Sequence, residues 1–266
     1  MVFLVRCTHV VAGILHLRSP SLIISAMCIE MKSRVVRLPG VSSRNGLAVE
    51  NRHNTGEWRE IVSSAVTVLK QGGVIAVPTD TIYGIAGLAQ NSEAIERIYE
   101  LKGRNGNKPL AICVGSIKQI YRFCKVTVPD HLLQDLLPGP VTLVFERLEA
   151  LNKNLNPFTH LVGVRIPDHA FMQELARACE EPLALTSANI SSQISTLKTE
   201  EFQDLWSRLG LVIDGGPIGD VMSPVCRLGS TVVNLSTPGK YNIIRQGCAL
   251  SHTEEVLQKY GLRSES

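Results

Sequence analysis

The sequence is poor in the features that mark several classes of protein. Aromatic residues make up only 5% of its 266 residues, so no stripe of basic and aromatic side chains for gripping nucleic acid stands out. The seven cysteines are odd in number and scattered, and no Cys-x-x-Cys pair occurs. This usage argues against a disulfide framework and against a zinc site, and it indicates a reducing compartment.

The familiar nucleotide-binding and hydrolase signatures are also missing. There is no Gly-x-x-x-x-Gly-Lys-[Ser/Thr], no Gly-x-Gly-x-x-Gly after a strand, no Gly-x-Ser-x-Gly and no His-Glu-x-x-His. The seven histidines show no metal-ligand spacing. Any phosphate site must therefore be built from side chains, and we expect any metal to arrive with a nucleotide as weakly held Mg²⁺.

The first thirty residues differ in composition from the rest of the chain. They contain Arg6, Arg18, several serines and short apolar runs, and no acidic residue precedes Glu30. This composition is typical of a mitochondrial presequence, and a poorly packed start to the chain fits it equally well. Charged residues and histidines interrupt the apolar runs, so we expect no transmembrane segment. We expect the protein in both the cytoplasm and mitochondria, with Met27 and Met31 as alternative starts.

A polar stretch separates this region from the patterned part of the chain. Residues 36–56 are rich in the Pro, Gly, Ser and Asn residues that are typical of linkers. We predict an N-terminal targeting and linker segment over residues 1–55, one globular domain over 56–250, and a C-terminal helix and tail over 251–266.

Helical and strand patterns alternate through the globular domain. Helices are predicted over 58–69, 92–102, 117–124, 130–137, 171–179 and from 199, with Asp168 as one N-cap and a capping box at Ser251 opening the last helix. Strands are predicted over 74–77, 110–114, 141–145, 162–166, 183–185, 211–213, 231–235 and 241–244. The last two strands read as a hairpin. The alternation favours an α/β fold with a mixed sheet.

Three cations occur within seven residues at the end of a predicted helix: Lys102, Arg104 and Lys108. Arginine can form a fork of hydrogen bonds to phosphate oxygens, and lysine acts as a point charge. The cluster is therefore suited to a polyphosphate. Alternatively, Lys102 complements the helix dipole and the other two cations are solvated.

Two polar loops follow predicted buried strands. One contains Thr79, Asp80 and Thr81, and the other contains Ser187 and Asn189. Ligand sites of α/β sheets lie at such positions, but the same residue types are ordinary turn formers. The residues alone leave both roles open.

Two arginines, Arg165 and Arg245, stand near the ends of apolar strands. A guanidinium buried there needs an anion, because an unpaired buried charge is costly. That anion is either a substrate or an acidic residue of the protein itself.

Several short motifs occur in one order over residues 57–250. They are Pro78-Thr79-Asp80-Thr81-Ile82-Tyr83-Gly84, Lys102-Gly103-Arg104, Lys108-Pro109-Leu110, Pro138-Gly139-Pro140-Val141-Thr142, Val164-Arg165-Ile166-Pro167, Thr186-Ser187-Ala188-Asn189, Gly229-Ser230-Thr231 and Arg245-Gln246-Gly247. In order and spacing they resemble the YrdC-like threonylcarbamoyl-adenylate synthases. Several motifs in register are far more specific than any one of them.

The resemblance implies a single α/β domain in which helices flank a twisted mixed sheet around a concave basic cavity. Residues 56–250 would form this catalytic domain. The implied reaction condenses L-threonine, bicarbonate or CO₂ and ATP, with Mg²⁺ accompanying the ATP, to threonylcarbamoyl-adenylate and pyrophosphate. The product would pass to a tRNA threonylcarbamoyl-transferase complex that forms N6-threonylcarbamoyladenosine, with weak or no direct RNA binding by this chain.

The resemblance also implies roles for individual residues. Catalytic roles fall on Lys102 and Arg104. The implied ATP site consists of Arg104, Lys108, Ser187, Asn189, Ser195 and Arg245. The implied threonine site consists of Thr79, Thr81, Cys113, Arg165 and Ser230. Many bacterial and archaeal relatives carry His where Cys113 stands.

Two other functions fit parts of the pattern. An RNA-binding module without catalysis is the main alternative, because a basic surface can hold a phosphate backbone. A transferase that uses carbamoyl phosphate would need phosphate-binding cations too. Formation of adenylate and pyrophosphate without RNA would separate the synthase from both.

Overall fold

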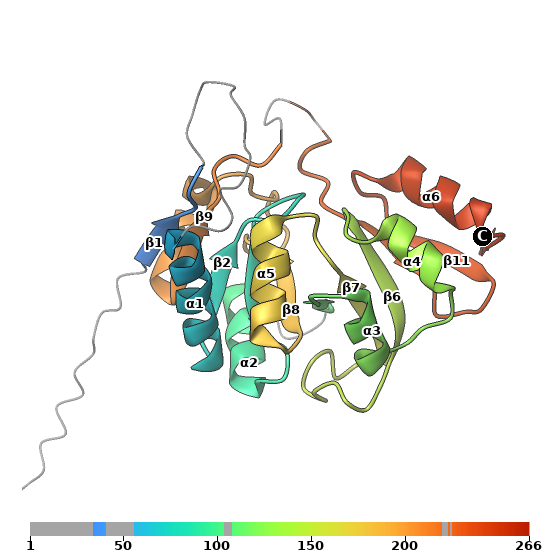
Figure 1. Cartoon of the computed structure of the whole chain (residues 1–266), viewed down its shortest axis with the longest axis horizontal. Helices are drawn as coiled ribbons and strands as arrows, with labels where there is room; N and C mark the ends of the chain where they lie inside the picture. Colours follow the sequence, from blue (N-terminus) through green and yellow to red (C-terminus); the bar gives the residue numbers. More distant parts are fainter. Residues whose placement is uncertain (1–33, 41–55, 104–107, 220–222, 224, 266) are drawn as a thin grey trace, which may run out of the picture. The chain divides into compact units, whose positions relative to one another are not determined.

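The computed structural model describes residues 34–40, 56–103, 108–219, 223 and 225–265 (Figure 1). The chain divides into one unit over Met1–Glu30 and another over Met31–Ser266, and every described residue belongs to the second. The predicted presequence and most of the predicted linker lie outside the described residues. The predicted domain boundaries stay predictions.

Among the described residues, twelve strands form a mixed sheet. The strands are β1 (Arg34–Arg37), β2 (Ile75–Val77), β3 (Gly84–Leu88), β4 (Ala111–Cys113), β5 (Cys124–Lys125), β6 (Val141–Arg147), β7 (Leu161–Arg165), β8 (Leu183–Ser187), β9 (Leu211–Asp214), β10 (Thr231–Asn234), β11 (Lys240–Arg245) and β12 (Arg263–Ser264). Their order is β1-β9-β2-β3-β8-β4-β7-β6-β10-β11-β12, and β5 pairs with β6 outside this path. Since β6 is parallel to β10 and antiparallel to β7, the predicted mixed sheet is confirmed.

Helices cover the two faces of the sheet. They are α1 (Gly56–Lys70), α2 (Ser92–Leu101), α3 (Ile117–Phe123), α4 (Asp130–Leu136), α5 (Ala170–Cys179), the 3₁₀ helix η2 (Thr199–Arg208) and α6 (Leu250–Lys259). Helices α1 and α5 pack on one face of β9, β2, β3, β8 and β4. The other helices contribute to a larger apolar cluster on the opposite face. None of the helices in the described part of the chain is long and apolar enough to cross a membrane.

The alternation of side chains along the strands explains this layering. In β2, Ile75 and Val77 belong to the cluster with α1 and α5, whereas Ala76 belongs to the larger cluster. A strand buried on both faces reads as a continuous apolar run, which is how β2 appears in the sequence. The two glycines of β3, in the sequence GIAGL, hide its strand character, and the sequence analysis missed it.

Several predicted details are corrected by the structure. The N-cap of α5 is His169 rather than Asp168, because the first intrahelical hydrogen bond runs from the N–H of Gln173 to the carbonyl of His169 (3.0 Å). Asp168 instead donates its backbone N–H to the carboxylate of Asp80 (3.0 Å). Helix α6 begins at Leu250, so Ser251 lies within the first turn and the predicted capping box does not form. Strand β1, which the sequence analysis did not predict, pairs in parallel with β9.

Four neighbouring strands bring together residues that are far apart in the sequence. The antiparallel register of β6 and β7 pairs Leu143 with Val164, and Thr142 and Arg165 are the next residue on each strand at the same end of the pair. Strand β10 runs parallel to β6 with Val232 beside Thr142, and β11 places Arg245 opposite Val232. Ser230 directly precedes β10. The sheet thus aligns two arginines and two hydroxyl side chains in one row.

Candidate anion-binding site

The loop after β2 is held by its own hydroxyl groups. Thr79 Oγ1 donates to the carbonyl of Ile82 (2.7 Å) and accepts from the backbone N–H groups of Thr81 (3.1 Å) and Ile82 (3.2 Å). Thr79 is only 3% exposed. The turn-forming role that the residues left open is therefore present for Thr79. Its contact with L-threonine, implied by the resemblance, stays a prediction.

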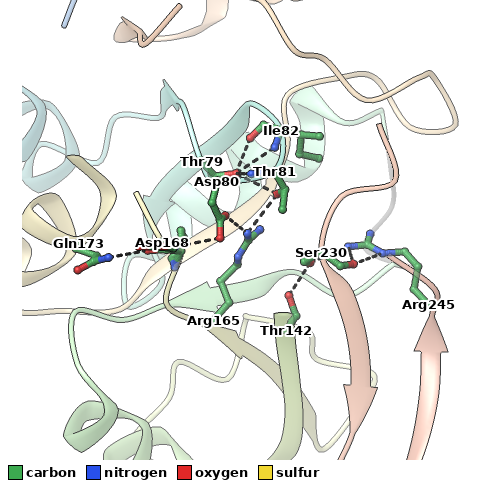
Figure 2. A network of polar contacts seen from close by, with 11 residues as sticks. Thr79, Asp80, Thr81, Ile82, Thr142, Arg165, Asp168, Gln173, Ser230 and Arg245 are labelled. Atoms are coloured by element: carbon green, nitrogen blue, oxygen red, sulfur yellow. Dashed lines mark hydrogen bonds and ion pairs between the residues drawn. The ribbon is translucent and has the colours of Figure 1, made fainter. Parts of the chain in front are cut away.

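A buried ion pair lies beside this loop. Figure 2 shows Arg165, at the end of β7, bonded to Asp80 and to the hydroxyl of Thr81. The side chains of Arg165 and Asp80 are 7% and 9% exposed. An acidic residue of the protein therefore pairs with Arg165, which was one of the two possibilities open from the sequence. Sequence reasoning named Asp80 as a loop residue but could not assign it to this partner.

Arg165 keeps a donor for something else. Its Nε is buried and has no hydrogen-bond partner among the described residues. A buried donor without an acceptor costs about 1–3 kcal/mol. An oxygen anion placed beside Arg165 would satisfy this donor, so the residue fits a ligand as well as its internal partner.

A second cluster of polar groups lies beside this pair, on the neighbouring strands β6, β10 and β11 and the segment before β10 (Figure 2). Ser230 Oγ accepts from Arg245 Nη2 (3.0 Å), and Ser230 O accepts from Arg245 Nε (3.1 Å) and Nη2 (2.8 Å). Ser230 Oγ also lies 2.9 Å from Thr142 Oγ1. Gly247 permits this packing, because a Cβ there would lie 2.2 Å from the Ser230 carbonyl carbon.

The electrostatics of the row favour an anion. Partial burial lowers the pKa of Arg245, and the positive charge of Arg165 lowers it further. The two guanidinium groups are therefore close enough to repel each other. Asp80 neutralises one of these charges, so the row of residues is left with a net positive charge that a carboxylate or phosphate oxygen would compensate.

Cys113 packs in the core rather than presenting a reactive thiolate. It is fully buried at the end of β4, beside Arg165 in the parallel register of β4 and β7. Burial raises the pKa of its thiol to about 12, although the charge of Arg165 acts in the opposite direction. The thiol is therefore protonated at neutral pH. Its implied contact with L-threonine stays a prediction.

Lys102 lies in the interior rather than in solvent at a helix end. Its side chain is 0% exposed, and its ammonium group donates to the carbonyl (2.7 Å) and hydroxyl (3.3 Å) of Ser187 and to the side-chain oxygen (2.8 Å) and backbone carbonyl of Asn189. This geometry holds the loop that follows β8. No local pattern in the sequence indicates this burial, because lysines at helix ends are usually solvated.

The other residues of the implied ATP site are less fully placed. Lys108 is exposed, and Arg104 lies outside the described residues. The carbonyl of Ser195 accepts from Arg227 Nη1 (2.6 Å), and Arg227 forms a fork to the carboxylate of Glu201 (2.8 and 2.9 Å). Sequence reasoning missed Arg227 and Glu201, which carry no local motif.

Backbone hydrogen bonds join the two parts of the site. The N–H of Tyr83 donates to the carbonyl of Thr196, and the N–H of Ala188 donates to the carbonyl of Tyr83, each at 2.9 Å. The loop of Thr79 and Thr81 and the loop of Ser187 and Asn189 are thus parts of one framework.

In the described part of the chain, no group of three or more His, Cys, Asp or Glu side chains could hold a metal ion. Asp80 is occupied by Arg165 and by the backbone of Asp168. Mg²⁺ commonly binds through substrate phosphates with few protein ligands, so these residues suit a metal that enters as part of MgATP. That expectation stays a prediction.

A mixed sheet flanked by helices, with two arginines and hydroxyl side chains aligned across four strands, defines an α/β protein whose site suits an anionic ligand. The model of the Sua5_yciO_yrdC family, described as "Telomere recombination", matches residues 67–247. The chain belongs to this family.

Named relatives agree with this placement. The chain is 60% identical over 230 residues to the threonylcarbamoyl-AMP synthase of Bos taurus, covering 86% of this chain and 82% of the bovine protein. It is also 60% identical over 231 residues to the human threonylcarbamoyl-AMP synthase, covering 86% and 81%. A crystal structure of Pyrococcus abyssi Sua5 complexed with L-threonine is similar with a TM-score of 0.69 at 26% identity, covering 88% of this chain and 63% of that chain.

Proposed function

We infer that this chain is a threonylcarbamoyl-AMP synthase, a nucleotidyltransferase. It condenses L-threonine, bicarbonate or CO₂ and ATP to threonylcarbamoyl-adenylate and pyrophosphate, for formation of N6-threonylcarbamoyladenosine in tRNA. The observation that carries this inference is the 60% identity to synthases of that name over 86% of the chain. The aligned arginines Arg165 and Arg245 give the reaction's anions a physical place to bind.

We place the amino-acid substrate beside Thr81, Arg165 and Ser230. The free Nε–H of Arg165 supports this placement, because a carboxylate is the strongest acceptor for a guanidinium donor. Thr81 and Ser230 are 5% and 3% exposed, so their hydroxyls are already desolvated and fixed. A site prepared in this way gives orientation at little entropic cost.

We place the nucleotide along Ser187, Asn189, Ser195 and Arg245, with Arg104 and Lys108 at its phosphates. Lys102 then acts mainly by fixing the loop of Ser187 and Asn189, because its ammonium is already bound to four oxygens of that loop. Arg245 lies between the two substrates, since it donates to Ser230 on the amino-acid side.

The chemistry needs positioning and charge stabilisation rather than a covalent enzyme intermediate. The amine of threonine adds to the carbon of CO₂ and releases a proton to solvent, which gives a carbamate. With bicarbonate as the source, the amine proton leaves with the lost oxygen as water. The carbamate oxygen then attacks the α-phosphorus of MgATP, the bond to the bridging oxygen breaks, and pyrophosphate leaves. Two anions must approach each other in this step, so preset cations lower the barrier by offsetting the repulsion and stabilising the leaving group.

The test is turnover of the purified chain with MgATP, L-threonine and bicarbonate in the absence of RNA. We expect threonylcarbamoyl-adenylate and an equal amount of pyrophosphate. The variant Lys108→Ala should weaken MgATP binding about tenfold or more, whereas Lys118→Ala, at an exposed position of α3, should not. Retention of RNA without turnover would instead support the RNA-binding alternative.

We also propose that the product passes directly to a tRNA threonylcarbamoyl-transferase complex. An adenylate is a reactive mixed anhydride, so a short transfer path would limit its hydrolysis. Gel-shift measurements with tRNA should then show weak or no binding by this chain alone. Tight binding by the isolated chain would contradict this part of the proposal.

A further inference from the structure

Thr142 belongs to the Pro138–Thr142 motif, yet no role in the reaction has been assigned to it so far. It is the second residue of β6 and is 5% exposed. Its Oγ1 lies 2.9 Å from Ser230 Oγ, and Figure 2 shows the two hydroxyls facing each other between Arg165 and Arg245. The hydroxyl of Thr142 can therefore determine whether Ser230, which we place against the substrate, donates or accepts a hydrogen bond with the ligand.

The orientation of Thr142 is set by its neighbour in β7. A Cβ on Gly163 would lie 2.9 Å from the methyl carbon of Thr142. The methyl group therefore lies against Gly163, and the absence of a side chain there makes this rotamer possible. The hydroxyl then points to the other side, toward Ser230.

The hydroxyl groups of Thr142 and Ser230 have one more hydrogen than their mutual bond uses. The guanidinium of Arg245 can only donate, so it uses one acceptor position of Ser230 Oγ. Thr142 and Ser230 each bring one hydroxyl hydrogen, and the bond between them uses one of the two. In the part of the chain that the structure describes, neither hydroxyl has a further partner. One hydroxyl hydrogen therefore remains to be donated elsewhere.

The two possible senses of this bond are not equivalent. If Ser230 donated to Thr142, the remaining hydrogen would belong to Thr142, which sits within β6 and packs against β7. If Thr142 donates, the remaining hydrogen belongs to Ser230, which precedes β10 and lies beside the cation of Arg245. An oxygen anion attracted by the two arginines can accept from Ser230, so the second sense leaves no buried donor unmatched.

We propose that Thr142 is a positioning residue for the amino-acid substrate. It donates its hydrogen to Ser230 while Arg245 occupies the other acceptor position, so Ser230 directs its own hydrogen to a carboxylate oxygen of the substrate. This proposal rests on the proposed function, in which Ser230 contacts L-threonine. It makes Thr142 a determinant of amino-acid affinity without any contact to the reacting atoms.

The experiment compares Thr142→Val, which keeps the shape and removes the hydroxyl, with Thr142→Ser, which keeps the hydroxyl. Calorimetry on the full chain should show an L-threonine Kd raised about tenfold in Thr142→Val, the effect expected for one lost hydrogen bond. The MgATP Kd should stay within about twofold and the melting temperature close to wild type. Thr142→Ser should bind L-threonine like wild type. If Thr142→Val does not fold, Thr142→Ala replaces it.

A double-mutant cycle with Ser230→Ala tests whether Thr142 acts through Ser230. In the Ser230→Ala background, Thr142→Val should cause no further loss of L-threonine affinity, because the hydroxyl that it orients is gone. Equal losses in both backgrounds, equal weakening of MgATP and L-threonine, or an unchanged Thr142→Val variant would each overturn the proposal. These results differ from a failure of the proposed function, in which the wild-type chain itself would neither bind L-threonine nor form the adenylate.

Discussion

At the scale of single residues, the ion pair of Asp80 and Arg165 is better explained by a role in ligand binding than by a gain in stability. Burying two charges is expensive, and a buried pair often adds no net stability compared with apolar residues of similar size. The two carboxylate oxygens of Asp80 do, however, hold Arg165 and the backbone N–H of Asp168 at the same time. We therefore interpret Asp80 as a residue that orients Arg165 for an anionic ligand.

We predict that Asp80→Leu lowers the free energy of unfolding by about 3–5 kcal/mol, because it leaves the buried guanidinium of Arg165 unpaired. The double variant Asp80→Leu/Arg165→Met should regain much of that loss, since no buried charge remains. It should still fail to bind L-threonine. Urea unfolding and calorimetry on the three proteins check both points. A double variant that binds L-threonine normally would remove Arg165 from the site.

Lys102 carries a further buried charge, and its removal should lower the affinity for one substrate more than for the other. We predict that Lys102→Met lowers the free energy of unfolding by about 1–3 kcal/mol, because oxygens of Ser187 and Asn189 lose their donor. The loop on the nucleotide side should loosen, so MgATP affinity falls while L-threonine affinity changes little. An equal loss of affinity for MgATP and for L-threonine would show that Lys102 supports the whole fold and has no local role.

At the scale of elements, the segment after β11 must pass very close to the segment before β10. A Cβ on Gly247 would overlap the peptide of Ser230 and Thr231, at 2.2 Å from two of its atoms. We predict that Gly247→Ala displaces Ser230 and weakens L-threonine binding by at least tenfold, a loss comparable to one hydrogen bond. Gly56→Ala is the control, because a Cβ there meets nothing within 4 Å. Normal binding by Gly247→Ala would show that the two segments can separate without harm.

The fork between Arg227 and Glu201 ties the segment of Ser195 to helix η2. The hydrogen bond from Arg227 lowers the pKa of Glu201 below its ordinary 4.5. A carboxylate with a lowered pKa in the folded state stabilises the protein above its ordinary pKa, and the contribution disappears as the pH falls through the lowered value. Both side chains are about one-third exposed (34% and 29%).

We predict that Glu201→Gln lowers the free energy of unfolding by roughly 0.2–1 kcal/mol at neutral pH, because a partly exposed ion pair contributes little. The difference from wild type should shrink as the pH is lowered below 4.5. Urea unfolding of both proteins at several pH values measures it. A difference that grows toward acid pH would contradict this sign.

Apolar periodicity predicts much of this architecture, but it predicts neither the N-caps of α5 and α6 nor the partners of the buried charges. The hairpin of β10 and β11 and the strand β7 follow from local apolar patterns, and all are present. In contrast, Arg165 pairs with Asp80, which is distant in the sequence. No local pattern shows whether the partner of Arg165 is this acidic residue or a ligand. Lys102 is misleading for the same reason, since its acceptors come from the loop after β8.

The contact between Thr142 and Gly163 is a feature of the site that the sequence motifs do not predict. In the sequence they are ordinary residues of two apolar strands. Their relation depends on the register of β6 against β7, which a single sequence determines only weakly. The resemblance to a family implies which residues face the substrates, and that part stays a prediction. The contacts behind those residues depend on the tertiary structure.

At the scale of the whole molecule, we propose that residues 1–30 direct part of the protein to mitochondria. A fluorescent fusion of the full chain should co-localise in part with mitochondria, because the segment carries Arg6 and Arg18 and no acid before Glu30. Replacing both arginines by Glu should abolish this. Deletion of residues 1–30 should leave adenylate formation intact. A full-length fusion found only in the cytosol would refute the proposal.

During synthesis, β1 to β9 leave the ribosome before Ser230 and Arg245 do, because the last of these strands ends at Asp214. A nascent chain of that length already holds Asp80 and Arg165, and these two can neutralise each other. On the proposed placement of the substrates, the amino-acid site is complete only when β10 pairs in parallel with β6 and β11 pairs antiparallel with β10. The unfinished protein therefore contains the ion pair of the row but not yet its second arginine.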